Sequence, residues 1–272
     1  MKLPQRLALL IGLSLAAFGV ASCQGGDPGH VSPKAEIHRA YTEILRCDPS
    51  RHGASFTTAL AEVDSGLLST SQVVADVITM ARGTTSVATL NYQFFTHGTP
   101  TVAGIDYLVS PTGPNKNNLN SPYYQAMNQD NRFINFAVNL GTVGAGAAEF
   151  KATYGPMTVS EATSKAYFEI FGAHPTAGKV AAILKQEVGK NADGSPQTRE
   201  QYLAAIGKDG PQAIGTKAAI VGWLLSQSVT SNVGDYALSN NAFLTDIAKG
   251  STKYGIDMIA KYNKPENHYK GG

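Results

Sequence analysis

The chain has 272 residues, 43% of them hydrophobic, with 22 Lys and Arg against 20 Asp and Glu. This length allows one sizeable core or two lobes. Leaving out Lys2 and Arg6 at the start reduces the basic residues to 20, a formal net charge of zero. Because no basic cluster stands out, this balance argues against nucleic acid and against anionic membrane surfaces as main partners.

The first 22 residues have the pattern of a bacterial lipoprotein signal peptide. Lys2 and Arg6 provide a positive start, and residues 7–20 form an apolar run that is too short to be a stable membrane span. The run ends in Val20-Ala21-Ser22-Cys23, which fits a lipobox. We therefore predict lipidation of Cys23, which would anchor the mature chain stably, and the residue after it, Gln24, favours the outer membrane. The alternative is an ordinary secretory signal that leaves Cys23 as a thiol.

Residues 23–33 follow as a predicted flexible tether, since they contain three Gly and two Pro and little apolar content. If Cys23 is lipidated, Cys47 remains as one thiol, which can form neither an intrachain disulfide nor a CxxC redox pair. Cys47 is then expected to be a small, buried apolar residue. The six His residues show no metal-ligand spacing. We predict no metal site and no cofactor.

From residue 34 to residue 263 the sequence predicts an all-α domain, followed by a disordered tail over residues 264–272. Pro33 after Ser32 begins a helix, and capping boxes begin three more at Ser69, Thr158 and Thr198. Glycines at 83, 172 and 207 are expected to end these three helices. A long apolar helix with Trp223 is predicted from Pro211 to about residue 228. The last helices are expected at 241–249 and 254–262.

The sequence also contains a degenerate internal repeat. In each copy a tyrosine begins a short segment and a proline follows eight residues after that tyrosine. The pairs are Tyr41 with Pro49, Tyr92 with Pro100, and Tyr167 with Pro175, with Gly53, Gly104 and Gly178 following. This pattern predicts degenerate helix–turn–helix units in an irregular superhelical or bilobed arrangement. The glycines would permit close approach of helices, or be incidental. Small residues in the run 141–148 are likewise expected to allow close helix packing.

The most distinctive stretch runs from Asn91 to Ala147 and combines aromatic rings with side-chain amides. Sugar C–H groups pack on aromatic rings while amides bind hydroxyls, so the composition suits a glycan, although these residues could equally fill a helical core and cap its helices. Residues 110–122, SPTGPNKNNLNSP, have turn-forming composition and read either as a binding loop or as a solvated connector.

Two motifs in this stretch carry a family resemblance. YQFFTHGTPTVAGIDYLV and YYQAMNQDNRFINFAVNL resemble the N-terminal domain of the Caulobacter-type RTX surface-layer protein, with NRFINF as the most specific part. The resemblance is strongest over residues 90–150 and extends at lower similarity from about 37 to 262. It implies an all-helical domain that attaches a surface layer to the O-polysaccharide of lipopolysaccharide. The chain lacks the calcium-binding RTX repeats, which puts assembly into a lattice in doubt.

We therefore predict a non-catalytic outer-membrane lipoprotein on the cell surface. Its expected partner is the O-polysaccharide, with the surface-layer protein as a further candidate. Stacking platforms are predicted at Tyr92, Tyr107, Tyr123 and Tyr124, and hydrogen-bonding groups at Asn131, Arg132 and Asn135, with Arg132 the best donor to an anionic group. The alternative is a helical module that binds a surface-layer or envelope protein without recognising sugar.

An enzyme acting on envelope glycan is the third hypothesis. The sequence has no GxSxG or HExxH motif. Asp106 and Asp130 are the acids of the aromatic stretch, and a structural or capping role is expected for both. A pair of acids within a groove would favour the enzyme.

Overall fold

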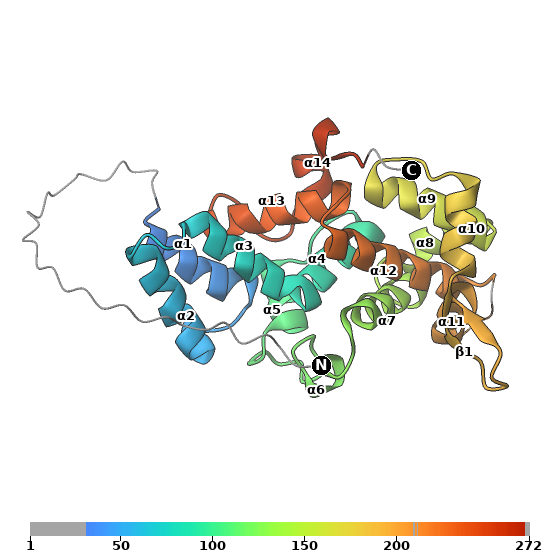
Figure 1. Cartoon of the computed structure of the whole chain (residues 1–272), viewed down its shortest axis with the longest axis horizontal. Coiled ribbons are helices and arrows are strands. Elements are labelled where there is room, and N and C mark those ends of the chain that lie inside the picture. Colours follow the sequence, from blue (N-terminus) through green and yellow to red (C-terminus); the bar gives the residue numbers. More distant parts are fainter. Residues whose placement is uncertain (1–30, 209, 211, 270–272) are drawn as a thin grey trace, which may run out of the picture. The chain divides into compact units, whose positions relative to one another are not determined.

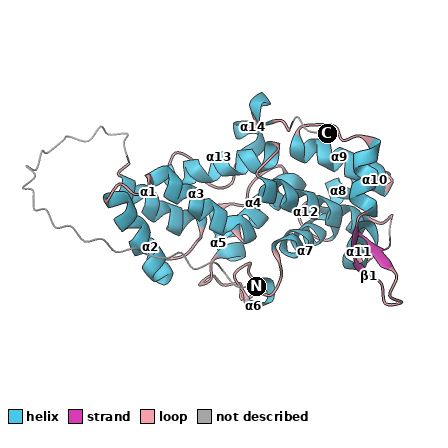
Figure 2. Ribbon diagram, in the orientation of Figure 1, coloured by secondary structure: helices cyan, strands magenta, loops and turns pink. Residues whose placement is uncertain are grey.

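The computed structural model describes residues 31–208, 210 and 212–269. The predicted signal peptide, the lipidation at Cys23 and most of the predicted tether lie outside these residues. Within the described part, fourteen α-helices and one two-stranded sheet confirm the all-α prediction (Figures 1 and 2). No helix of this part is both long enough and apolar enough to span a membrane.

The elements follow one another with short connections. The first group is α1 (Pro33–Arg39), the π-helical turn η1 (Ala40–Ile44), α2 (Pro49–Asp64), α3 (Thr70–Met80), the 3-10 turn η2 (Ala81–Gly83), α4 (Thr85–Thr96) and α5 (Val102–Val109). The second is α6 (Pro122–Gln125), α7 (Gln129–Thr142), α8 (Ala147–Tyr154), α9 (Val159–Phe171), α10 (Ala177–Lys185), β1 (Glu187–Lys190) and β2 (Pro196–Thr198). The third is α11 (Arg199–Gly207), α12 (Ile214–Ser231), α13 (Asp235–Lys249), α14 (Met258–Tyr262) and the 3-10 turn η3 (Pro265–Asn267).

Four of the predicted helix starts are confirmed by their caps. Ser32 caps α1 with Pro33 in the first turn, and Ser69, Thr158 and Thr198 each form a complete capping box. In each box the hydroxyl accepts a backbone N–H three residues on, and the Gln or Glu there accepts the cap's own N–H. Helix starts are thus encoded locally and readable from sequence.

The structure differs from the sequence prediction in several places, among them the last helices, where α13 begins at Asp235 rather than 241 and α14 at Met258 rather than 254. A short antiparallel hairpin, β1–β2, lies before α11, where the predicted fold had no strand. The long helix α12 begins at Ile214, three residues later than predicted. Part of the predicted disordered tail is instead ordered: η3 covers residues 265–267, and the Tyr269 N–H donates to the Phe171 carbonyl at 2.9 Å. Segments of three or four residues have too little periodicity to be recognised.

The core is built around the pairing of α7 with α12. A Cβ at Gly222 of α12 would lie 2.6 Å from the Phe133 carbonyl oxygen of α7, so the two backbones meet where only glycine fits. Phe133 and Leu224 are completely or almost completely buried. The expected close packing in the run 141–148 is also confirmed, because a Cβ at Gly141 would lie 2.8 Å from the Ala218 Cβ of α12.

Helix α4 is buried on nearly all sides, and its polar residues join distant parts of the chain. The Thr89 hydroxyl donates to Asn240 of α13 at 2.7 Å, and Asn240 in turn donates to Ser86 at 3.1 Å. The Gln93 amide donates to Asp257 at 2.9 Å. Buried polar groups need such partners, so these bonds specify how α4 packs against α13 and the α14 start.

The degenerate repeat of tyrosine and proline corresponds to pairs of helices. Each repeat proline lies at or just before the start of the second helix of its pair: Pro49, Pro100 and Pro175. The expected close approach at the glycines is wrong. At Gly53 an added Cβ would meet nothing within 4 Å, and at Gly104 and Gly178 it would meet only atoms of its own turn. The glycines are therefore not helix contacts.

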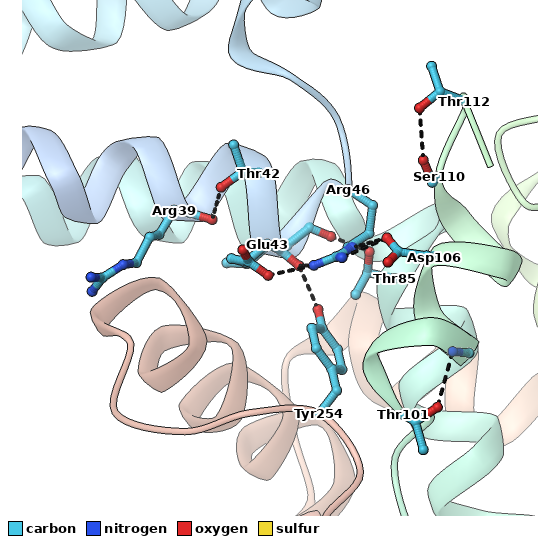
Figure 3. A network of polar contacts seen from close by, with 12 residues as sticks. Arg39, Thr42, Glu43, Arg46, Thr85, Thr101, Asp106, Ser110, Thr112 and Tyr254 are labelled. Atoms are coloured by element: carbon cyan, nitrogen blue, oxygen red, sulfur yellow. Dashed lines mark hydrogen bonds and ion pairs between the residues drawn. The ribbon is translucent and has the colours of Figure 1, made fainter.

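Arg46 ties the N-terminal helices to α5 (Figure 3). Its Nε donates to Asp106 Oδ1 at 2.8 Å, and its Nη1 pairs with Glu43 Oε2 at 2.5 Å. The Tyr254 hydroxyl donates to the Glu43 carbonyl at 2.9 Å beside them. Burial alone would lower the pKa of Arg46, but Asp106 and Glu43 outweigh it and the pKa is raised. The network fixes α5, which carries Tyr107.

Candidate functional site

The segment between α5 and α6 is folded against the end of α5. The Leu119 N–H donates to the Leu108 carbonyl at 2.9 Å, and Leu119 is fully buried. The side-chain amides of Asn118 and Asn120 donate to the carbonyls of Ser110 and Val109, both at 2.7 Å. These amides therefore hold the segment in one conformation, as a binding surface requires.

Two of the predicted platforms, Tyr107 and Tyr123, present exposed rings on either side of this segment. Tyr107 on α5 is 52% exposed and Tyr123 on α6 is 57% exposed. Tyr107 directly precedes Leu108, and Tyr123 lies four residues after Leu119. The hydrogen bond between Leu108 and Leu119 therefore joins the chain just after Tyr107 to the chain just before Tyr123. Exposed aromatic rings of this kind can stack against a ligand.

The other two predicted platforms face inward. Tyr124 is 7% exposed, and its hydroxyl donates to Asn135 Oδ1 at 2.9 Å. Tyr92 is partly buried against Phe136, with ring centroids 6.2 Å apart. Burial raises the pKa of both hydroxyls, with a smaller contribution from Tyr123 at Tyr124. Both side chains contact α7, Tyr92 through the ring of Phe136 and Tyr124 through its hydrogen bond to Asn135.

The amides predicted on α7 already have protein partners. Asn131 Oδ1 accepts the Tyr202 hydroxyl of α11 at 2.7 Å, and Asn135 accepts Tyr124. The two side chains thus connect α7 to different neighbours, α11 and α6. Asn135 is half-buried next to Tyr124, whereas Asn131 belongs to a separate contact.

Arg132 joins three elements through carbonyl oxygens. Its Nε donates to Met127 at 3.1 Å, Nη1 to Gly83 at 3.0 Å, and Nη2 to the Gln125 backbone and side chain at 3.4 and 3.3 Å. No carboxylate of the described residues lies within ion-pair distance of it. Burial lowers the pKa of the Arg132 guanidinium. Its charge is thus hydrogen-bonded but not neutralised.

Arg132 also lines a cavity of about 220 Å³ beside the folded segment. Pro111 and Asn120 of that segment line the same cavity, as does Gln125 of α6. The cavity lining thus contains a cation and two side-chain amides, a combination that suits a hydroxylated and anionic ligand. Asn120 and Gln125 were not among the predicted site residues, because their amides carry no signal beyond the Asn-rich composition.

The predicted acids of the aromatic stretch have structural partners, as expected. Asp106 pairs with Arg46, and Asp130 accepts from Ser226 at 2.5 Å and from Gln227 at 3.2 Å. Within the described chain, no group of three His, Cys, Asp or Glu residues is arranged for a metal ion.

A different pair of acids, Glu149 and Glu169, does line one cavity of about 420 Å³. Glu169 accepts from Lys165 at 2.5 Å and from the Tyr154 hydroxyl, and Glu149 lies 3.0 Å from His97. Both carboxylates are thus engaged by neighbouring donors. Hydrolysis of a glycosidic bond needs one acid and one nucleophile or base to face it, so this cavity is the place to test for an enzyme.

The described residues thus form an all-helical domain that presents exposed tyrosines on both sides of an amide-held segment. The chain belongs to the RsaA N-terminal domain family, whose model matches residues 84–270. This match confirms the resemblance to the surface-layer N-terminal domain and relates the chain to lipopolysaccharide and the cell surface. A search of curated proteins found no match to the chain.

Proposed function

We propose that the protein is a non-catalytic lipoprotein of the outer membrane that binds the O-polysaccharide of lipopolysaccharide on the cell surface. Family membership is the observation that carries this proposal. Acylation of Cys23 would supply the anchor, with the helical domain held outward. The surface-layer protein, whose own attachment uses a domain of this family, would be a neighbour or competitor at the same glycan.

The surface formed by Tyr107, Tyr123 and the Arg132 cavity is the proposed contact. Its exposed rings offer apolar faces, and Arg132, whose charge no described carboxylate neutralises, offers a cation at the cavity that Asn120 and Gln125 also line. Tyr92, Tyr124, Asn131 and Asn135 would act mainly by supporting this surface, since their rings or amides are engaged within the protein.

A pull-down tests the proposal. Mature protein with Cys23→Ser is incubated with cells that carry or lack O-polysaccharide. We expect retention only on cells with O-polysaccharide, and weaker retention when Tyr107 and Tyr123 are both replaced by alanine. Equal retention on both cell types would contradict binding to O-polysaccharide and favour a protein partner instead.

Lipidation and catalysis have separate tests. Full-length protein from cells fed labelled palmitate should carry the label at Cys23 and lose it in Cys23→Ser; retention of the label would contradict the anchor. Incubation with O-polysaccharide should release no new reducing ends. Release that depends on Glu149 or Glu169 would establish the enzyme instead.

A further inference from the structure

A third cavity, of about 480 Å³, lies among α9, α10, α12 and the C-terminal residues, and shares no lining residue with the Arg132 cavity. This volume is within the range of small-ligand sites. Its polar and aromatic lining consists mainly of Lys179, Gln186, Arg199, Trp223, Gln227 and Tyr269. The proposed O-polysaccharide surface does not include it.

Arg199 is the unusual residue of this cavity. It is 8% exposed, and its guanidinium carbon lies 3.9 Å from the centroid of the Trp223 ring. Nη1 donates to the Ile183 carbonyl at 2.9 Å and Nη2 to Gln186 Oε1 at 2.7 Å. A guanidinium has five N–H donors, so three remain beyond these two bonds.

The charge of Arg199 has no carboxylate partner within ion-pair distance in the described part of the chain. A buried cation without an anion is costly, and burial lowers its pKa, an effect that the more distant Asp130 partly offsets. Asp130 itself accepts from Ser226 and Gln227. Arg199 therefore keeps a charge at the cavity wall that no carboxylate of the described residues neutralises at close range.

A second cation, Lys179 of α10, lines the same cavity and is half-buried. Among the described residues, its ammonium makes no hydrogen bond or ion pair, and the cavity lining contains no carboxylate. Two cations that line one concave space attract negative charge more strongly than the same cations far apart on a flat surface.

The rest of the lining determines what kind of anion fits. Trp223 and Tyr269 are partly exposed aromatic rings, and the amides of Gln186 and Gln227 lie at the same cavity. Aromatic faces pack against the C–H groups of a sugar, and amides bind its hydroxyls. A bare inorganic anion would use only the two cations.

We propose that this cavity binds an anionic sugar unit, a pyranose that carries a carboxylate or a phosphate, with Arg199 and Lys179 holding the anion. The geometry that carries the proposal is the buried, acid-free guanidinium stacked on Trp223 at the wall of a cavity of ligand size. The site stands independently of the O-polysaccharide surface and can be tested without that glycan.

Trp223 provides the measurement, because it is the one tryptophan of the chain. Its fluorescence is followed while the protein is titrated with glucuronic acid, glucose 6-phosphate, inorganic phosphate or glucose at constant ionic strength. We expect a saturable change with one or both anionic sugars and none with glucose. Glucuronic acid alone would identify a carboxylate ligand, and glucose 6-phosphate alone a phosphate ligand.

Substitutions on α10 provide the matched test. Lys179→Gln should weaken binding of the anionic sugar by about tenfold, the usual effect of losing one charge-assisted hydrogen bond. Lys185→Gln, on the same helix but outside the cavity lining, should leave it unchanged. No saturable response, an equal response to glucose, a response to inorganic phosphate as strong as to glucose 6-phosphate, or equal effects of the two lysine variants would each overturn the proposal.

Discussion

Replacing the neighbouring residues Tyr123 and Tyr124 by alanine, one at a time, is expected to separate a surface role from a structural one. Their rings contact each other at 5.2 Å, yet Tyr123 is 57% exposed and Tyr124 is 7% exposed. Because the two residues share a helix, chain position and helix propensity differ little between the variants. Differences in stability should therefore report burial.

The magnitudes follow from the contacts. Truncation of a buried aromatic side chain costs about 3–5 kcal/mol, and the Tyr124–Asn135 hydrogen bond contributes about 1 kcal/mol. Because α6 has four residues and can relax toward the cavity, we expect Tyr124→Ala to lower the free energy of unfolding by about 3 kcal/mol. Tyr123→Ala should cost at most about 1 kcal/mol, mainly the ring contact.

Urea unfolding followed by circular dichroism measures both changes. Tyr124→Phe is the control, because it removes only the hydroxyl and should cost about 1 kcal/mol. The reasoning fails if Tyr123→Ala is as destabilising as Tyr124→Ala, or if Tyr124→Ala costs less than Tyr124→Phe.

Three further outcomes are expected. Gly222→Ala should destabilise the protein by about 1–3 kcal/mol, because the new methyl group would clash with α7. Gly178→Ala on α10 is the control: its methyl group would have open space and should stabilise the protein by up to about 1 kcal/mol. Equal unfolding midpoints of the two variants would contradict the close packing at Gly222. Arg46→Met should lower the free energy of unfolding, measured by chemical denaturation, by about 1–2 kcal/mol. The effect is modest because the acid partners of Arg46 are over 40% exposed. An unchanged free energy of unfolding would show that the network does not stabilise the fold. Burial raises the pKa of Asp235, so the native state binds this proton more tightly and stability should rise as the pH falls through that pKa. Asp235→Asn should make the unfolding temperature depend less on pH. If the variant shows the same change of unfolding temperature with pH as the original protein, this role of Asp235 is refuted.

Helix starts that carry a side-chain cap could be predicted because their signals are local. A capping box needs only a hydroxyl residue and a Glu or Gln three residues on, and Ser69, Thr158 and Thr198 all behave accordingly. Contacts between helices could not be predicted from the sequence in the same way. The residue type alone does not show that Gly222 lies against a neighbouring backbone whereas a Cβ at Gly53 would meet nothing within 4 Å.

The candidate site shows the same limit. Composition located the aromatic and amide-rich stretch, but alternation between exposed Tyr123 and buried Tyr124 depends on the entry angle of α6, which no local signal encodes. Arg199 and Trp223 are 24 positions apart, and only the packing of α11 against α12 brings the guanidinium over the ring. Contacts between distant segments therefore decide which polar residues face a cavity.

The affinity of the mature domain for isolated O-polysaccharide, measured by isothermal titration calorimetry, tests the central claim most directly. We expect saturable binding by the Cys23→Ser protein, weakened at least tenfold in the Tyr107→Ala, Tyr123→Ala double variant while the unfolding free energy stays within about 1 kcal/mol. Absence of binding, or equal binding by the double variant, would contradict the proposed glycan surface.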